Sequence, residues 1–261
     1  MNLSLRRIYA IILRSFYTDK RSTMRLTEVF YYPAIDIILW GLTTRWLNKG
    51  ANHTGLLAIA TSIVLWVTVT RVVYEISVGM IEEVWNRNMT NLFGTPIKLS
   101  EWMIGLMACG IIKICVVLPY SALIAYFAYG VNVFSVGWML LPYLGLLVCS
   151  GWSIGLLGAS VILLFGRQAQ STPWMTAWFF APLCAVYYPL ESLPTALRNL
   201  ATVTPLAHAF EAIRHQILTG TTSWHHIKMG IILAIVWLTA SIFIFYRMFN
   251  RARQRGLASF E

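Results

Sequence analysis

Long apolar runs separated by short polar segments occupy most of the chain. A bilayer core of about 30 Å is crossed by about 20 apolar residues in helical form, and six runs approach or exceed that length. They cover residues 29–46, 56–80, 102–129, 137–165, 172–188 and 227–249. The pattern predicts an all-α polytopic membrane protein with six transmembrane helices, in a single transmembrane domain over residues 1–261.

Residues 2–25 carry too many charges for a seventh span and have the periodicity of an amphipathic helix. Its apolar face consists of residues at helical spacing, namely Leu5, Ile8, Ile12 and Phe16. A separate stripe, with one arginine every seven residues, consists of Arg7, Arg14 and Arg21. We expect an interface helix whose arginines face anionic lipid headgroups. The alternative is an ordinary solvated helix face.

The polar segment at residues 81–100 joins the second and third runs and suits a short surface helix. The residues that favour this helix are Glu82, Glu83, Trp85, Asn86, Arg87 and Phe93. Gly94, Thr95 and Pro96 would end it, because glycine caps a helix and proline cannot continue one. Large aromatics in a polar segment are typical of interface anchors. The segment is therefore either a docking helix for a partner, anchored by Trp85 and Phe93, or a plain connecting loop.

The longest segment outside the predicted spans, residues 189–226, precedes the last run and suits two short helices. The first would begin near Pro194. The second would take Thr204 as its N-cap and Pro205 as its first residue, would run to about Leu218, and would be capped by Gly220. Two amphipathic helices at this point predict an outer re-entrant helical hairpin between the fifth and sixth spans.

His208, Glu211 and His215 fall at i, i+3 and i+7 on the second of these helices and raise the alternative of a membrane-embedded enzyme. Their spacing differs from the metalloprotease patterns, which need two histidines four apart or an adjacent Glu-His pair. We therefore expect three polar residues on the wet face of an amphipathic helix, and no metal site.

Ionisable residues inside spans are costly and mark sites of function or of packing. Four lie within the predicted spans: Asp36, Arg71, Glu75 and Lys113. Arg71 and Glu75 are four residues apart and can pair on one helix face, whereas Asp36 and Lys113 could pair only between spans. These charges either fix the packing of the helices or line a polar path for cargo. Gly151 and Gly155, four apart in the fourth run, predict close helix packing, within the bundle or at a dimer seam.

The composition indicates a membrane protein, and the distribution of its basic residues predicts its orientation. Of the 261 residues, 58% are hydrophobic and 11% charged, and the mean hydropathy is +0.66. Thirteen Lys and Arg residues fall on the side of the predicted termini and five on the other, so the positive-inside rule places both termini in the cytoplasm. The net charge of +10 thus reflects orientation in a membrane and not binding to nucleic acid. No phosphate-loop motif and no catalytic constellation is found in the sequence.

Two segments resemble the ABC-2 family of ATP-binding-cassette exporter permeases. The outer segment carries that family's aromatic-Pro-Leu-x-x-Leu-Pro run followed by Pro-Leu-x-His and an arginine, here Tyr188, Pro189, Leu190, Leu193, Pro194, Pro205, Leu206, His208 and Arg214. The segment before Thr95-Pro96 resembles the family's coupling-helix region, although the usual Glu-Arg-Glu opening is here Glu82-Glu83-Val84. The Pro-Leu-x-His form is most similar to the nodulation-factor and drug-exporter arm.

The resemblance implies a transmembrane subunit that is not itself catalytic and holds no cofactor. A homodimer of this subunit would lie in the bacterial cytoplasmic membrane and pair with two copies of a separate ATPase subunit, which would bind ATP and Mg²⁺. The ATPases would push on residues 82–95, next to Pro96, and on the interface helix, and the outer hairpin would shape the exit. A non-transport membrane scaffold is the remaining alternative.

Overall fold

The computed structural model describes residues 3–47 and 53–256, which form helices and turns without a strand. The helices are α1 (Leu5–Arg21), α2 (Thr23–Leu26), α3 (Tyr32–Leu47), α4 (His53–Trp85), α5 (Met89–Gly94), α6 (Leu99–Tyr129), α7 (Leu140–Phe165), α8 (Thr172–Phe180), α9 (Thr195–Ala201), α10 (Pro205–Thr219) and α11 (Trp224–Arg255). A π-helical turn, Thr27–Tyr31, joins α2 to α3. Short 3-10 segments cover Val133–Met139, Gly166–Ala169, Ala181–Leu183 and Leu190–Ser192. The predicted all-α class is confirmed for this part of the chain.

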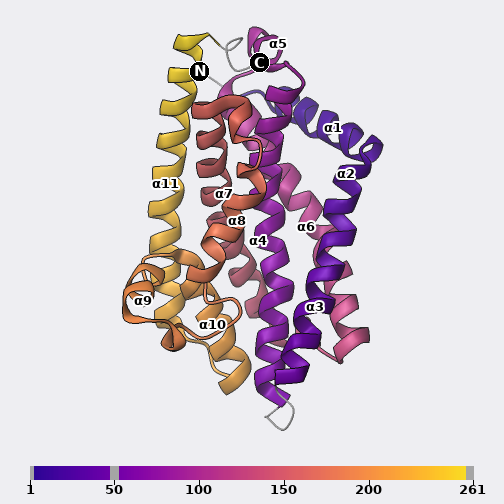
Figure 1. Ribbon diagram of the computed structural model, residues 1–261, viewed down its shortest axis with the longest axis vertical. Helices are drawn as coiled ribbons and strands as arrows, with labels where there is room; N and C mark the ends of the chain where they lie inside the picture. Colours follow the sequence, from indigo (N-terminus) through magenta and orange to yellow (C-terminus); the bar gives the residue numbers. More distant parts are fainter. Residues whose placement is uncertain (1–2, 48–52, 257–261) are drawn as a thin grey trace.

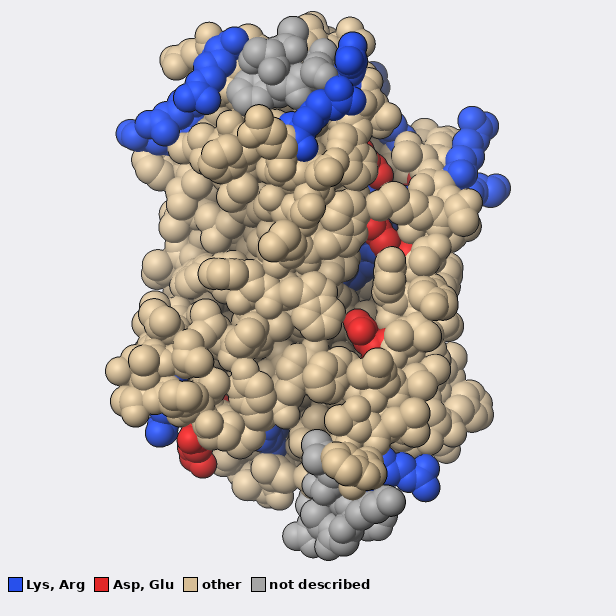
Figure 2. Space-filling model, in the orientation of Figure 1, with Lys and Arg blue, Asp and Glu red and all other residues tan. Residues whose placement is uncertain are grey.

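The long helices share one axis, and α4 lies at the centre of the bundle (Figure 1). It packs against α3, α6, α7, α8 and α10. α1 and α5 lie at the end of the bundle where α11 finishes, and α9 and α10 lie at the opposite end (Figure 1); we call these the α5 end and the α10 end. Figure 2 shows basic side chains gathered at the α5 end, fewer charged side chains at the α10 end, and between them a broad band that is uncharged except for a few acidic and basic atoms on one side. This is the charge distribution of a protein that spans a membrane.

Four of the six predicted spans have helices long and apolar enough to cross a bilayer. They are Leu57–Trp85, Leu99–Tyr129, Val133–Ala169 and Trp224–Arg255, and they correspond to the second, third, fourth and sixth runs. The first run falls largely in α3, which has only 16 residues, contains Asp36 and is not among them.

The continuous helix expected over residues 172–188 is wrong. α8 has nine residues, and a 3-10 turn, Ala181–Leu183, follows it directly. Pro182 lies in that turn and cannot donate a backbone hydrogen bond to continue the helix. Ala185 then takes a positive φ of 54°, which turns the chain out of helical geometry. The fifth run is thus a short helix that leads into irregular backbone.

α4 and α7 pack closely against each other at the glycines predicted to form a packing face. A Cβ atom added at Gly155 would lie 3.1 Å from the Val73 carbonyl oxygen, and one at Gly151 would lie 3.3 Å from the Val69 carbonyl oxygen. Ser77 Oγ donates a hydrogen bond to the Gly155 carbonyl oxygen at 3.1 Å. The small residues therefore serve contact within the bundle, where they allow two backbones to approach.

We predict that Gly155→Leu destabilises the protein by at least about 1–3 kcal/mol, the usual cost of overpacking a core, because neighbouring backbone cannot move aside. The measurement is the thermal inactivation midpoint of the purified protein in a nonionic detergent. Gly145→Leu on the same helix is the matched control, since an added Cβ there meets nothing within 4 Å. Equal midpoints for the two variants would contradict the packing described.

Candidate functional site

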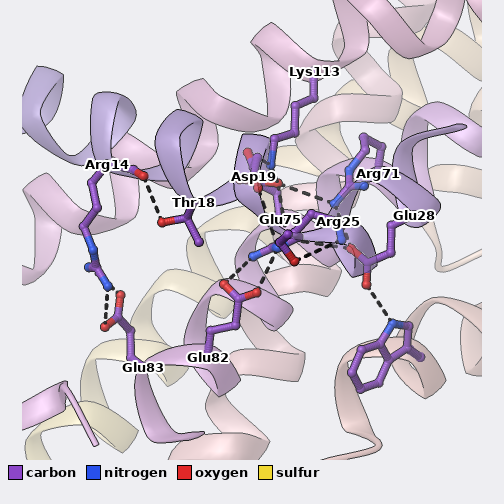
Figure 3. Close-up of polar contacts among 12 residues, drawn as sticks. Arg14, Thr18, Asp19, Arg25, Glu28, Arg71, Glu75, Glu82, Glu83 and Lys113 are labelled. Atoms are coloured by element: carbon purple, nitrogen blue, oxygen red, sulfur yellow. Dashed lines mark hydrogen bonds and ion pairs between the residues drawn. The ribbon is translucent and has the colours of Figure 1, made fainter. Parts of the chain in front are cut away.

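A cluster of charged side chains joins the N-terminal helices to α4 and α6 near the α5 end (Figure 3). At its centre, Lys113 Nζ lies 2.6 Å from Asp19 Oδ2 and 2.7 Å from Glu75 Oε2. The Glu75 side chain is 1% exposed. One ammonium group on α6 therefore ties a carboxylate of α1 to a carboxylate of α4.

Two arginines complete the cluster. Arg25 binds both carboxylate oxygens of Glu82, at 2.9 and 2.7 Å, and lies 3.8 Å from Glu28 and from Glu75. Arg71 Nη2 lies 3.5 Å from Glu75 Oε2 and 3.6 Å from Glu28 Oε2. Buried charges are tolerated only when they are paired, and here nearly balanced charges from α1, α2, the π-helical turn, α4 and α6 compensate one another.

The predicted Arg71–Glu75 pair is confirmed, and the possible Asp36–Lys113 pair is wrong because Lys113 binds Asp19 and Glu75 instead. Asp36 has no hydrogen bond or ion pair within residues 3–47 and 53–256. Sequence reasoning missed the cluster's remaining members, namely Asp19, Arg25, Glu28 and Glu82. The only signal in the sequence was that Arg25 and Glu28 stand just before the first apolar run, three residues apart.

Two of the three arginines in the predicted stripe of the N-terminal helix bind protein carboxylates. Arg14 forms a bidentate pair with Glu83, at 2.7 and 3.0 Å. Arg7 lies 3.2 Å from Glu101 at the start of α6 and donates to the Pro96 carbonyl oxygen. Arg21 is exposed. The stripe expected to face lipid headgroups therefore attaches α1 to the ends of α4 and α6.

The polar segment after α4 differs in extent from the short helix predicted over residues 82–93. Glu82, Glu83 and Trp85 belong to the last turn of α4, and the chain then turns through Arg87, with φ of 49°. α5 follows and ends at Gly94, as predicted. Thr95 Oγ donates to the Leu92 carbonyl oxygen at 2.6 Å, which satisfies a carbonyl group at the end of α5.

The two aromatics predicted as exposed anchors are partly buried in the bundle. Trp85 stacks on Trp174 of α8 with ring centroids 6.1 Å apart. Phe93 packs edge-on against Phe249 of α11 at 4.6 Å. The side chains that this segment exposes are polar: Asn86, Arg87, Thr90 and Asn91. Aromatic contacts thus hold α5 on the bundle and leave a polar outer surface.

A cavity of about 360 Å³ lies over one face of α4, between α3 and α8. Its floor is formed by residues at helical spacing, namely Val67, Thr70, Arg71 and Tyr74. Glu28, Tyr32, Pro33 and Asp36 line one wall, Trp174 and Trp178 the other, and Val117 of α6 also contributes. Figure 2 shows acidic and basic atoms in a hollow on the corresponding face. Charged groups are therefore accessible from this cavity, between the two charged ends of the bundle.

The predicted outer hairpin forms two helices at the α10 end, α9 and α10. Thr204 caps α10, since its Oγ accepts a hydrogen bond from the Ala207 N–H at 3.4 Å, and Pro205 is the first helical residue. Gly220, with φ of 70°, ends the helix. These boundaries are confirmed. Pro194 precedes α9 in extended conformation.

The resemblance motif of the hairpin forms one buried polar contact. Arg214 Nη1 lies 2.6 Å from Glu211 Oε1, and its Nη2 donates to the Ala185 carbonyl oxygen at 2.6 Å. Glu211 Oε1 also accepts from the Leu190 N–H at 2.8 Å. Burial lowers the pKa of Arg214, while Glu211 opposes that shift. The motif residues Pro189, Leu190 and Leu193 lie around this contact, so Arg214 fixes the irregular backbone that precedes α9 to the face of α10.

The histidines do not converge on a metal or catalytic site. His208 was expected on the wet face of its helix, but it is buried, with Nε2 2.9 Å from the Thr202 carbonyl oxygen and Nδ1 3.1 Å from His226 Nδ1. His215 is exposed and lies 3.0 Å from the Thr221 carbonyl oxygen. In the described parts of the chain, no three His, Cys, Asp or Glu side chains are placed to hold a metal ion.

We predict that Arg214→Met loosens the hairpin. The variant loses two hydrogen bonds made by a charged group, each worth about 1.5–3 kcal/mol. Limited proteolysis of the detergent-solubilised protein, with cleavage mapped in residues 190–203, should be several-fold faster than in the unaltered protein. Arg198→Met, an exposed arginine on α9, is the control and should leave the rate unchanged. Unchanged cleavage in Arg214→Met would show that other contacts hold the hairpin.

Comparison with known families gives one match. Residues 7–218 match the family model described as ABC-2 type transporter. A search of curated proteins finds no match. The matched region begins in α1, ends in α10 and contains the charged cluster, the cavity and the outer hairpin.

Proposed function

Because the chain belongs to the ABC-2 type transporter family, and is therefore the transmembrane component of an ABC transporter, we propose that it lines the cargo path of an ATP-driven exporter. Two copies of the chain would pair with two ATPase subunits, which bind ATP and Mg²⁺. We place the complex in the bacterial inner membrane, with the α5 end and both termini in the cytoplasm. The basic α5 end supports this orientation.

The observation that carries the proposal is the chain of ion pairs between α1, α2 and the end of α4. Arg14 binds Glu83 and Arg25 binds Glu82, and both carboxylates lie in the turn of α4 that leads into α5. A displacement of α5 would therefore also displace the N-terminal helices. Lys113 extends the connection to the middle of α6 through Asp19 and Glu75. Packed elements joined in this way move as rigid bodies between discrete arrangements.

We assign the contact with the ATPase to the polar surface of the segment after α4. Asn86, Arg87 and Asn91 are exposed there, and Trp85 and Phe93 transmit the contact to α8 and α11 through their ring contacts. Pro96 and Thr95 join this segment to α6. Chemistry takes place in the ATPase, and this chain changes shape.

α3 and α8 would complete six membrane crossings, as shorter segments that pack on α4.

At the α10 end, α9 and α10 would form the re-entrant hairpin that shapes the outer exit, held by Arg214 and by the buried His208. In this arrangement Asp36 and Arg71 line the path, and Glu75 and Lys113 brace it. The cargo class of the nodulation-factor and drug-exporter arm fits the same architecture.

The test is assembly with a separately encoded ATP-binding-cassette ATPase subunit from the same genome. Co-expression should yield a complex whose native mass fits two copies of each subunit, and its ATPase rate should change when the membrane subunit is present. Accumulation of cargo inside inverted vesicles on addition of ATP would establish export. A complex that forms but leaves both ATP hydrolysis and vesicle uptake unchanged would overturn the proposal in favour of a scaffold.

A further inference from the structure

The cavity over α4 contains one charge that the protein leaves without a partner. Three ionisable side chains line it: Glu28, Asp36 and Arg71. Arg71 is compensated by Glu28 and Glu75, at 3.6 and 3.5 Å, and Glu28 also accepts a hydrogen bond from Trp174 Nε1 at 3.1 Å. Asp36, one turn beyond Tyr32 on the same face of α3, has no such partner in the described structure. The cavity therefore presents a net negative charge at Asp36.

Four aromatic side chains also line the cavity. Tyr32 belongs to α3 and Tyr74 to α4, and Trp174 and Trp178 stand one helical turn apart on α8. Aromatic faces attract cations through the ring quadrupole, most strongly when the site excludes water. A carboxylate that shares a cavity with four such rings is the arrangement expected for an organic cation, because the cavity supplies both a counter-charge and an apolar contact surface.

The size and position of the cavity suit such a ligand. Its volume of about 360 Å³ lies within the usual range for small-molecule sites, roughly 300–1,000 Å³. Tyr32 is 54% exposed and Trp178 is 43% exposed, so the mouth reaches the lateral surface between α3 and α8. An amphipathic molecule dissolved in the membrane could enter there without crossing a polar end of the bundle.

We propose that this cavity binds organic cations, with the charged nitrogen at Asp36 and the aromatic rings of α3, α4 and α8 around its substituents. The inference rests on the proposed function only where it makes these cations the cargo of the transporter. Binding of a cation to the cavity needs no ATPase. The same chemistry is offered by free quaternary ammonium compounds and by the choline headgroup of a lipid.

The experiment is equilibrium dialysis of the full chain in a nonionic detergent with radiolabelled benzyltrimethylammonium. We expect saturable binding that weakens at least tenfold in Asp36→Asn and Trp178→Leu and survives in Asp36→Glu. Two variants outside the cavity are the matched controls, Glu191→Gln and Trp138→Leu, which alter exposed residues of the same types. Neopentylbenzene, the neutral isostere of the probe, should compete far more weakly than the unlabelled cation.

Competition with dihexanoylphosphatidylcholine then separates the two sources. Displacement at low concentration assigns the site to a lipid headgroup, and its absence assigns it to free cations; either outcome supports the cation site. Binding that is equal in Asp36→Asn and the unaltered chain, or equal competition by neopentylbenzene, would overturn it. Because this assay contains no ATPase, its failure is separate from a failure of assembly or of ATP coupling.

Discussion

Glu75→Gln should be the most damaging single substitution in the membrane-embedded part of the protein. The carboxylate is buried and lies 2.7 Å from Lys113 Nζ and 3.5 Å from Arg71 Nη2. Removing its charge leaves three cations, Arg25, Arg71 and Lys113, to share the remaining carboxylates of the cluster. Breaking a buried ion pair by removing one partner costs about 3–5 kcal/mol, and here the lost partner serves several cations.

The measurement is the half-life of the folded protein at a fixed temperature in a nonionic detergent, followed by size-exclusion chromatography. We expect Glu75→Gln to shorten it by more than an order of magnitude. Adding Lys113→Gln in the same chain removes the cation nearest to the lost carboxylate, 2.7 Å away, and should recover part of the loss. Glu191→Gln, which alters an exposed carboxylate, should match the unaltered protein. If the double variant proved less stable than Glu75→Gln alone, mutual compensation would not be what holds the cluster.

The features that depend on local spacing could be predicted from the sequence. Arg71 and Glu75 are one turn apart, so any helix places them together. Thr204-Pro205 and Gly220 bound α10 because capping depends on residues next to the helix end. The membrane character of the chain follows equally from apolar runs that need no knowledge of their neighbours.

The features that the sequence left open depend on contacts between distant segments. Arg25 and Glu82 are 57 residues apart, and no periodicity relates them. Trp85 and Phe93 are large aromatics in a polar segment, which predicted exposed anchors. They are instead partly covered by Trp174 and Phe249, which belong to other helices. His208 was assigned to the wet face of α10 because α11, which supplies His226 as its neighbour, could not be placed.

In the fifth run, residues 172–188, the sequence contained a signal for a break in the helix, but the apolar length of the run favoured a span. That signal was Pro182, which marks the point where the helix ends. A second signal was the nearby Pro189 motif. In the structure the backbone there is irregular, and it is held by side chains of α10: Glu211 accepts from the Leu190 N–H, and Arg214 donates to the Ala185 carbonyl oxygen. Irregular backbone near a membrane is tolerated only where protein groups satisfy it, and these contacts supply that condition.

The proposed coupling surface leads to the second large effect, on assembly with the ATPase. Arg87 is exposed on the turn between α4 and α5, and its positive φ of 49° directs the chain into α5. Arg87→Glu reverses the charge of this surface without changing the backbone requirement. Like charges brought together at an interface cost several kcal/mol, and about 1.4 kcal/mol corresponds to a tenfold change in affinity.

We therefore expect Arg87→Glu to weaken binding of the ATPase subunit at least tenfold, measured by biolayer interferometry on the purified membrane subunit. Arg45→Glu reverses an equally exposed arginine on α3 towards the α10 end and should leave affinity unchanged, since no cytoplasmic partner reaches that end. Benzyltrimethylammonium binding should be intact in both variants, which shows that the cavity is folded. A loss of affinity in Arg45→Glu, with none in Arg87→Glu, would place the ATPase at the α10 end of the bundle and reverse the orientation proposed for the chain.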